Sequence, residues 1–235
     1  MLNTLRRNRQ RARERAWDAW RAVDFRLHRS AALQFAARLD AAATDGQRFD
    51  LVQQHLPGGS HQRRGEIVPF LETVAALRPR RILEIGTGDG GTTILLGRVA
   101  NSVESLAGAD LLVKNKPRIR RLVPPAQNVV LINGSSASAS TYSRVVRVLD
   151  GASLDLLFID GDHSYYGCLW DLRNIWGKML SGGLIYVHDY WTIDSLDPVA
   201  LCVHAFVEEV GSSKAQLSRV GTTTFARILV ATNNV

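Results

Sequence analysis

Hydrophobic positions follow two different spacings along the chain, and the change falls near residue 45. Between residues 5 and 43 there is no Gly or Pro, and apolar residues recur every three or four positions, as on one face of a helix. Beyond residue 80, short apolar runs alternate with helical stretches. The first pattern predicts one long helix, or two shorter helices, ending near Asp45-Gly46. The second predicts repeated strand–helix units built on a parallel sheet.

We therefore divide the chain into a helical N-terminal arm, residues 1–60, and an α/β domain, residues 61–235. Within the domain, helices are predicted from Thr92 onward, over Tyr165–Met179 and over Ala200–Val210. Ser181-Gly182-Gly183 is expected to form a turn. The apolar runs predict strands at Ile82–Ile85, Ser105–Ala109, Val129–Ile132, Leu154–Ile159, Leu184–Val187, Gln216–Val220 and Thr223–Val230.

The net charge of +7 suggests a nucleic-acid partner until it is located along the chain. Residues 1–40 contain ten Arg and four acidic residues, whereas the rest of the chain is nearly neutral, with 19 basic and 18 acidic residues. The arm has two interpretations: a helix that packs on the domain or a second subunit, or a contact for an anionic membrane surface or acidic partner.

Three further features limit the class of protein. No stretch approaches 18 consecutive apolar residues, so a membrane-spanning helix is excluded. The two cysteines, Cys168 and Cys202, do not have the spacing of a metal motif or a disulfide framework. The arm lacks the apolar core of a secretory signal. We therefore expect a cytoplasmic protein, with peripheral membrane association through the basic arm as an option.

A glycine-rich turn lies between the first predicted strand and the helix that follows it. Gly86-x-Gly88-x-x-Gly91 allows backbone N–H groups to approach a bound ligand closely. The same spacing is the dinucleotide fingerprint, and Asp110 follows near the position of its ribose-binding acid. The turn alone therefore fits either a nicotinamide enzyme or a methyltransferase.

Glu84 helps to separate these two cofactors. An acid two residues before the first glycine lies at the end of the strand, where it suits a cofactor with a positive amino group. The anionic pyrophosphate of NAD gains nothing from a carboxylate there. A purely structural role is the alternative, in which Glu84 pairs with Arg80 or Arg81.

Titratable residues follow two later strands. Asp160, Asp162 and His163 come directly after the strand at 154–159, and His188 and Asp189 follow the strand at 184–187. Neighbouring parallel strands end at the same edge of a sheet, so these side chains should meet there. Individually, Asp162 could cap the next helix and His188 could be a buried structural histidine.

The segment from Arg80 to Leu96 resembles motif I of the class I S-adenosylmethionine-dependent methyltransferases. This resemblance implies a Rossmann-like, doubly wound, mostly parallel seven-stranded sheet with an antiparallel last strand. It assigns Glu84 and the glycine loop to the methionine end of the cofactor, Asp110 to the ribose and Leu111 to the adenine. The implied cofactor-binding residues are Glu84, Gly86, Thr87, Gly88, Gly90, Asp110, Leu111, Ser135, Ser136 and Asp160.

The phrase from Phe158 to Tyr165 is similar to one in small-molecule O-methyltransferases of the macrolide-sugar and catechol or caffeoyl-CoA types. In the catechol type, the aspartate matching Asp160 binds magnesium, and a lysine three positions later accepts the substrate's proton. His163 stands in the place of that lysine. The resemblance thus implies His163 and Asp160 as catalytic residues. It also implies Asp160, Asp189 and His188 as ligands of Mg²⁺ or another divalent cation, although the last two depart from the usual Asp-Asn pair.

We predict that the protein transfers a methyl group from S-adenosylmethionine to a hydroxyl of a small molecule, such as a sugar, glycoside or phenol. The polar and aromatic loop at residues 190–198 would face this acceptor, or else be an ordinary surface connection. We also expect a homo-oligomer formed through the N-terminal helices. The alternatives are a nucleic-acid methyltransferase, disfavoured by the neutral domain and the absence of an Asn-Pro-Pro-Tyr-type motif, and a scaffold that binds the cofactor without catalysis.

Overall fold

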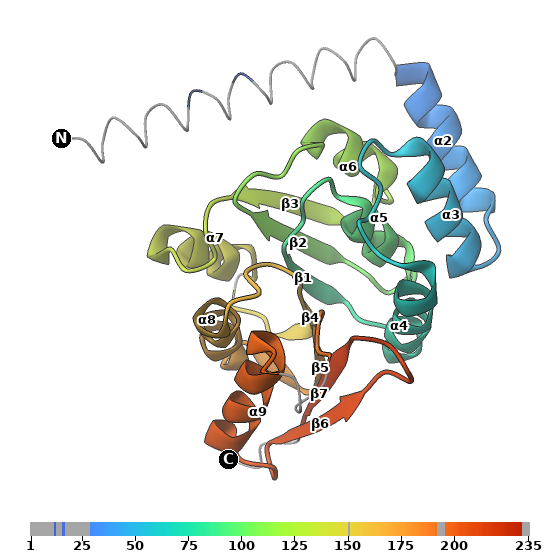
Figure 1. The fold of residues 1–235 in the computed structure, drawn as a ribbon. Coiled ribbons are helices and arrows are strands. Elements are labelled where there is room, and N and C mark those ends of the chain that lie inside the picture. The colour runs from blue at the N-terminus through green and yellow to red at the C-terminus, as the bar shows by residue number, and fades with distance from the viewer. Residues whose placement is uncertain (1–11, 13–15, 17–28, 150, 192–195, 232–235) are drawn as a thin grey trace.

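A seven-stranded sheet forms the centre of the computed structural model, which describes residues 12, 16, 29–149, 151–191 and 196–231 (Figure 1). The strands run in the order β3-β2-β1-β4-β5-β7-β6. This arrangement confirms the predicted Rossmann-like, doubly wound fold. The strands are β1 (Arg81–Ile85), β2 (Ser105–Asp110), β3 (Asn128–Asn133), β4 (Leu154–Ile159), β5 (Met179–Val187), β6 (Ala215–Arg219) and β7 (Ala226–Val230).

The pairing of the strands creates the crevice in which such folds bind ligands. Strands β1 to β5 are parallel, and β7 runs antiparallel to both β5 and β6, as predicted. The chain proceeds outward from β1 to β3 and then returns to β4 on the other side of β1. The carboxyl ends of β1 and β4 therefore flank the point where the strand order reverses, which is the usual ligand site.

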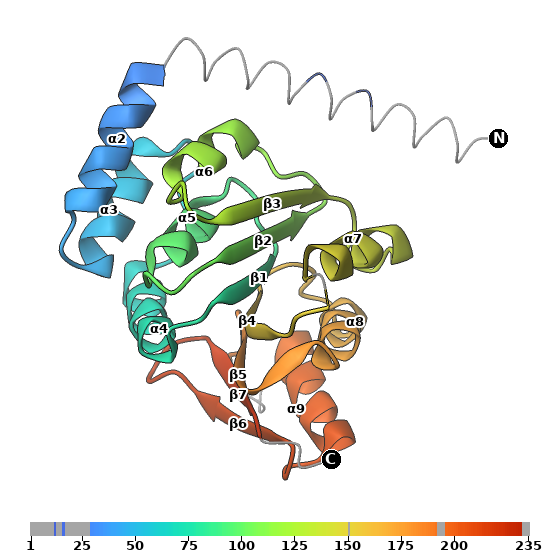
Figure 2. The same cartoon turned by 180° about the vertical axis from the view of Figure 1, so that it is seen from behind.

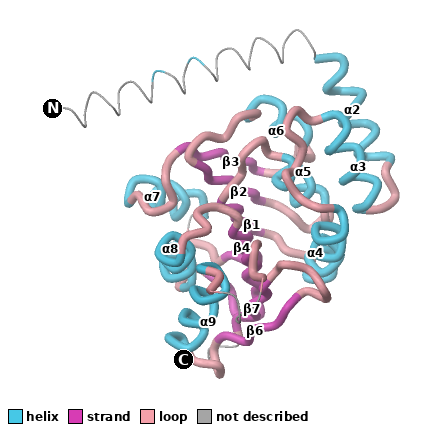
Figure 3. The backbone as a smooth tube through the Cα atoms, viewed as in Figure 1, coloured by secondary structure: helices cyan, strands magenta, loops and turns pink. Residues whose placement is uncertain are grey.

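Helices cover both faces of the sheet (Figures 1 and 2). One face carries α2 to α6, and the opposite face carries α7 to α9. The tube view separates the two helical layers from the sheet by colour (Figure 3). The helices are α2 (Arg29–Ala41), α3 (Asp45–His55), α4 (Arg64–Leu77), α5 (Gly91–Arg98), α6 (Lys116–Leu122), α7 (Ala139–Leu149), α8 (Tyr165–Trp176) and α9 (Pro198–Val210).

Each face of the sheet has its own hydrophobic core because side chains alternate along a strand. In β1, Ile82 packs with the α2–α6 layer, whereas Leu83 packs with the α7–α9 layer. Phe35 and Leu39 of α2 belong to the first core, so the described part of the arm packs on the domain. None of the described helices is long and apolar enough to cross a membrane.

The predicted end of the arm needs correction. Asp45-Gly46 begins α3 rather than ending a helix. Thr44 caps α3: its hydroxyl accepts from the Gln47 backbone N–H, while the Gln47 side chain accepts from the Thr44 N–H. This capping box stabilises a helix start by about 1 kcal/mol. The Arg-rich part of the arm, residues 1–28, lies outside the described residues except for positions 12 and 16.

The boundaries of β5 also differ from the prediction. Ser181-Gly182-Gly183 was expected to be a turn, but it lies within β5. The register between β4 and β5 shifts at this point, because Leu154 pairs with Met179 whereas Leu156 pairs with Leu184. The strand thus absorbs the glycine pair as an irregularity, which a period-two pattern cannot reveal.

Candidate active site

The site begins where β1 and β4 end side by side. The Asp160 backbone N–H donates to the Ile85 carbonyl at 2.8 Å, which holds the two strand ends together. The next residue on the β1 side, Gly86, has φ +97, and a Cβ there would collide with the Asp160 carbonyl oxygen. Only glycine fits both the backbone conformation and this close approach. The glycine loop is therefore shaped by the neighbouring strand.

A cavity of about 290 Å³ extends from Gly86 toward the ends of β2 and β3. The Asp110 carboxylate is held at its edge, since one oxygen accepts from the Gly88 N–H at 2.9 Å and the other from the Leu112 N–H at 2.7 Å. Each oxygen keeps a lone pair for further donors, such as a pair of ribose hydroxyls. The cavity is lined by Ile85, Gly86, Ala109, Asp110, Leu111, Gly134, Ser135, Ser136, Ala137, Asp160, Gly161, Asp162 and Gly167.

Glu84 lies beneath the glycine loop and is fully buried. One carboxylate oxygen accepts from the Thr93 hydroxyl, and the other has no hydrogen-bond partner among the described residues. Burial raises the pKa of Glu84 to about 8, although the Thr93 hydrogen bond opposes the shift. Glu84 lines neither cavity of the site. Its role toward the amino group of the cofactor stays a prediction.

The N-terminus of α5 is closed to the phosphates of a dinucleotide. The backbone of residues 59 and 60 packs so closely on Gly91 that a Cβ there would overlap it. The adjacent Asp89 is buried and negatively charged, with His61 Nε2 at 2.8 Å and Lys114 Nζ at 2.9 Å from its carboxylate. A pyrophosphate needs free N–H groups and no competing anion at this position. The covered helix start therefore disfavours NAD, which the glycine spacing alone had left open.

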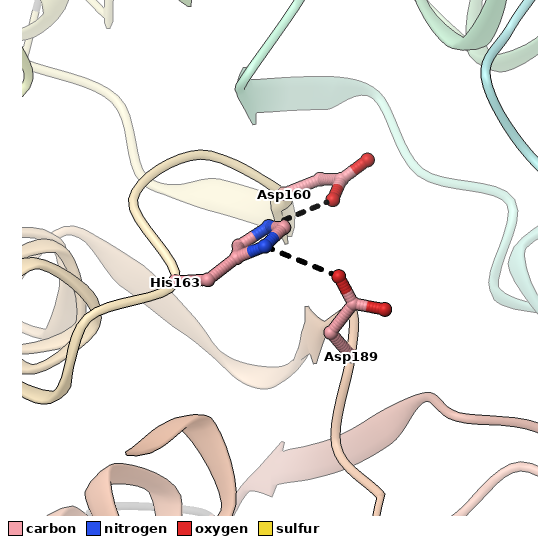
Figure 4. A group of neighbouring side chains, drawn as sticks. All are labelled: Asp160, His163 and Asp189. Carbon is pink, nitrogen blue, oxygen red and sulfur yellow. Dashed lines mark hydrogen bonds and ion pairs between the residues drawn. The ribbon is translucent and has the colours of Figure 1, made fainter. Parts of the chain in front are cut away.

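Three side chains from the turns that follow β4 and β5 meet at the edge of the sheet: Asp160, His163 and Asp189 (Figure 4). His163 lies between two carboxylates: its Nε2 is 3.3 Å from Asp160 Oδ1, and its Nδ1 is 3.2 Å from Asp189 Oδ2. Potential ligand atoms of these three residues lie within 4.8 Å of one another, which is compatible with one metal ion. Asp189 has φ +58, a conformation that Asp tolerates better than most residues.

Asp160 is the most heavily bonded member of this group. Besides His163, it receives a hydrogen bond from Gln62 Nε2 at 2.6 Å and lies 3.2 Å from His188 Nδ1. Burial alone would raise the pKa of Asp160, but the hydrogen bonds from the two histidines outweigh it and lower the pKa below its usual value. Asp160 therefore stays ionised and available as a base partner or ligand.

The two histidines respond in the opposite direction. The hydrogen bond to Asp160 raises the pKa of His163 above its ordinary value, and Asp189 adds to the shift. Burial lowers the pKa of His188, but Asp160 and Asp189 reverse this and raise it overall. His188 Nε2 is buried, has no hydrogen-bond partner in the described part of the chain, and lies 3.8 Å from Glu66 Oε2. His163 is therefore protonated up to a higher pH than an ordinary histidine.

A second cavity of about 430 Å³ opens on the side of the site nearest α4. It shares Gly86, Asp110 and Asp160 with the first cavity, so the two adjoin. Trp191 forms part of its wall and is 47% exposed, with the Arg63 guanidinium 6.0 Å from the ring centre. The second cavity is lined by Ser60, His61, Gln62, Arg63, Glu66, Gly86, Thr87, Gly88, Thr92, Asp110, Asp160, His163, His188, Asp189 and Trp191.

Residues 83–190 match the model of a family described as a methyltransferase domain. This segment contains the glycine loop, Asp110 and the Asp160–His163–Asp189 group. This segment, a little under half of the chain, is therefore similar to a methyltransferase domain. The predicted resemblance to the class I S-adenosylmethionine-dependent methyltransferases is confirmed by this match and by the fold. A comparison with curated protein sequences finds no match.

Solved structures similar to this chain include several O-methyltransferases. An O-methyltransferase from Bacillus cereus, in complex with S-adenosylhomocysteine (SAH), has a TM-score of 0.57 and 18% identity over 92% of this chain and 100% of its own. TomG from Streptomyces achromogenes, involved in tomaymycin synthesis and in complex with S-adenosylmethionine, has a TM-score of 0.53 and 23% identity over 92% and 98%.

The MycE methyltransferase of mycinamycin biosynthesis, in complex with Mg and SAH, has a TM-score of 0.59 and 15% identity over 80% of this chain. This chain spans about half of MycE, 55% of its length. At identities of 15–23%, these structural similarities show the fold alone.

The two adjoining cavities bring together most of the residues predicted from the sequence. Leu111, Ser135 and Ser136 line the first cavity, and Thr87, Gly88, His163, His188 and Asp189 line the second. Gly90, like Glu84, lines neither, because it begins α5 against Ile119. The sequence suggested Asp160, Asp189 and His188 as metal ligands. The three residues whose ligand atoms lie within 4.8 Å of one another are Asp160, Asp189 and His163. Gln62 was missed because nothing in the sequence links it to a partner 98 positions away.

Proposed function

We propose that the protein transfers a methyl group from S-adenosylmethionine to a hydroxyl of a small molecule. The observation that carries this proposal is the position of His163. It lies between two carboxylates in the second cavity, which shares Gly86, Asp110 and Asp160 with the first. A cofactor in the first cavity and an acceptor in the second would meet beside a base. Binding S-adenosylmethionine there would supply an electrophilic methyl group on a sulfonium.

The first cavity suits the nucleoside part of this cofactor. Asp110 offers acceptor-only oxygens to the ribose hydroxyls, and the exposed Leu111 offers an apolar surface for the adenine. The loop at 86–90 would hold the methionine end, with the Glu84 carboxylate beneath it. Holding two reactants within about 3 Å in the right orientation can lower the activation barrier for transfer by roughly 7–11 kcal/mol.

His163 would remove the proton of the acceptor hydroxyl. In its neutral form, Nδ1–H can donate to Asp189 while Nε2 presents a lone pair. Nε2 then faces an Asp160 oxygen 3.3 Å away with no proton between two acceptors. A small rotation of the ring away from this oxygen would present the lone pair to an acceptor hydroxyl in the second cavity. A positioned base of this kind typically accelerates a reaction by about 10²–10⁴-fold. Asp160 and Asp189 would then stabilise the imidazolium.

The same donor set fits a divalent cation. Asp160 and Asp189 offer carboxylate oxygens, which magnesium prefers, while the imidazole of His163 or His188 suits manganese or another transition metal. A bound ion would lower the pKa of the acceptor hydroxyl. His163 cannot serve as ligand and base through the same nitrogen. Chelation with EDTA followed by add-back of Mg²⁺ or Mn²⁺ separates the two roles, since full activity after chelation would leave His163 as the base alone.

The wall of the second cavity favours an acceptor with a ring. Trp191 exposes an aromatic face, and the Arg63 guanidinium lies above it. Aromatic faces bind the apolar faces of sugars and phenols, and arginine adds hydrogen-bond donors. A sugar, a glycoside or a phenol therefore remains the proposed acceptor class.

A methyl-transfer assay on a panel of hydroxylated sugars, glycosides and phenols tests the proposal. Mass spectrometry should find a product heavier than its acceptor by one methylene group, and formation of SAH in equal amount. The His163→Gln protein provides the matched control, because it should bind the cofactor and yield little product. Methylation of nucleic acid in place of these acceptors would refute the small-molecule assignment.

We also propose roles for the N-terminal arm beyond the described residues. The eight arginines of residues 1–28 would associate with a second copy of the chain or with an anionic membrane surface. The described helix α2 packs on the domain through Phe35 and Leu39, which leaves residues 1–28 for such a partner. Analytical ultracentrifugation of the chain with and without residues 1–28 distinguishes the two, because only the first partner changes the mass of the protein without lipid.

A further inference from the structure

Gln62 is a buried residue of the second cavity that has no part in the mechanism described above. It lies in the connection between α3 and α4 and is only 6% exposed. Its Nε2 donates a 2.6 Å hydrogen bond to Asp160 Oδ2, whereas its Oε1 is buried with no hydrogen-bond partner among the described residues. An unpaired buried oxygen is destabilising, so an apolar side chain of similar length would suit the fold better unless the N–H group is needed.

The hydrogen bond from Gln62 holds one end of the Asp160 carboxylate. Oδ2 accepts from Gln62, while the other oxygen, Oδ1, lies 3.3 Å from His163 Nε2 and 3.2 Å from His188 Nδ1. The terminal torsion of an aspartate is broad and roughly two-fold, so the carboxylate turns easily unless both oxygens are held. Because the two histidines contact the same oxygen, Gln62 fixes the plane of the carboxylate.

The backbone that carries Gln62 is itself held by α3. Gln53 of α3 accepts with its Oε1 from the Ser60 N–H at 2.7 Å, and its Nε2 donates to the Gln62 carbonyl at 3.4 Å. The Gln62 N–H donates in turn to the Ser60 hydroxyl at 3.4 Å. A residue on a well-held backbone can support a neighbouring side chain in one geometry.

We propose that Gln62 is a positioning residue, which keeps the Asp160 carboxylate directed toward His163 so that it can stabilise the imidazolium formed during methyl transfer. The inference rests on the proposed function, because it takes His163 as the base. Gln62 moves neither the proton nor the methyl group. A displacement of about 1 Å in an active site can cost about 10²-fold in rate. Loss of Gln62 should therefore lower kcat and leave cofactor binding nearly unchanged.

Gln62→Met tests this role, because methionine has a similar length and cannot donate to Asp160. With the acceptor that gives the most product in the panel assay, kcat should fall by about 10- to 100-fold. Calorimetric titration should give a Kd for SAH within about threefold of the wild-type value. The midpoint of thermal unfolding should stay within about 3 °C, since the variant also removes the unpaired oxygen.

Gln127→Met is the matched control. Gln127 Nε2 also donates a 2.6 Å hydrogen bond, to the Gly97 carbonyl, and its Oε1 is likewise buried without a partner in the described part of the chain. Gln127 lines neither cavity. The same substitution at this position should leave kcat within about twofold of wild type. An equal fall in kcat in both variants would overturn the inference.

A double-mutant cycle with Asp160→Ala separates positioning from a general effect on the fold. If Gln62 acts through Asp160, then Gln62→Met should change kcat by less than about twofold once the carboxylate has been removed. Single-turnover reactions with isotopically labelled S-adenosylmethionine measure these slow rates. A loss in the double variant as large as that in Gln62→Met alone would contradict the proposed role.

The possible outcomes separate this inference from the proposed function. If wild-type protein methylates none of the hydroxylated acceptors, both fail. If wild-type protein is active and Gln62→Met, folded by circular dichroism, keeps the wild-type kcat, the inference alone is overturned. If Gln62→Met does not fold, Gln62→Leu decides: a lowered kcat with an unchanged Kd for SAH supports the inference, and a wild-type kcat or a second failure to fold overturns it.

Discussion

The cofactor half and the acceptor half of the site are built in different ways. Around the first cavity, backbone geometry does most of the positioning: Gly86 allows the loop to approach β4, and backbone N–H groups hold the Asp110 carboxylate. Around the second cavity, side chains from separate elements position one another, and His163 lies between Asp160 and Asp189. The first half is positioned mainly by backbone atoms, and the second by charged side chains.

This difference predicts how each half responds to change. A substitution in the cofactor half should act by steric overlap and affect binding and stability together. A substitution in the acceptor half should shift pKa values and the rate of transfer while leaving cofactor binding nearly intact. The experiments below test this separation in order of decreasing expected effect.

Gly86→Ala should have the largest effect. The new Cβ would overlap the Asp160 carbonyl at φ +97, so we expect a loss of several kcal/mol in stability, on the scale of the most damaging substitutions. SAH binding should become undetectable. Thermal unfolding measures the loss of stability, and a calorimetric titration measures SAH binding.

Gly182→Ala is the control for backbone strain in this experiment. Gly182 has φ +83 with no neighbouring atom near the Cβ position, so it should cost only about 1 kcal/mol. Equal losses in the two variants would show that the contact with β4 is unimportant.

His163→Gln should lower kcat by about 10²–10⁴-fold, because the amide cannot take up the acceptor's proton. The Kd for SAH should change by less than about threefold, since His163 lines only the second cavity. Steady-state kinetics with direct binding measurements checks both values. A kcat close to that of wild type would exclude His163 as the base.

The pH dependence of kcat follows from the raised pKa of His163. The base must be neutral to act, so kcat should rise by about tenfold per pH unit until the pH passes a pKa above the usual histidine value. Asp189→Asn removes one of the charges that raise this pKa, so the rising limb should move to lower pH. If the rising part of the pH–kcat profile stays in place or moves to higher pH, Asp189 does not raise the pKa of His163.

Trp191→Ala should have the smallest effect. Removing the aromatic wall should raise the KM for the acceptor by about three- to tenfold, with little change in kcat or in SAH affinity. Trp170→Ala is a suitable control, because Trp170 is similarly exposed but lies on α8 and lines neither cavity. An equal change in both variants would remove Trp191 from the acceptor wall.

The sequence predicted the fold and the cofactor half well because their signals are local. Apolar runs mark the strands, and the glycine spacing marks a turn whose conformation depends on a few adjacent residues. The N-terminal boundary was less accurate because Thr44 and Gln47 form a capping box that outweighs the expected helix end. The irregularity of β5 depends on pairing with β4, which no single segment encodes.

The acceptor half could be predicted only as a list of residues. Parallel strand ends bring Asp160 and Asp189 to one edge, which the sequence pattern did indicate. The contact from Gln62 to Asp160 and the covering of α5 by residues 59 and 60 arise from tertiary packing. The raised pKa of His163 depends on distances of a few ångströms between separate elements. Such coupling emerges only when the elements are assembled.

A calorimetric titration of the wild-type protein with SAH, and separately with NAD, tests the central claim most directly. The cavity beside Asp110 predicts binding of one SAH per chain, and the covered start of α5 predicts no heat of binding with NAD. Tight binding of NAD with none of SAH would contradict the account.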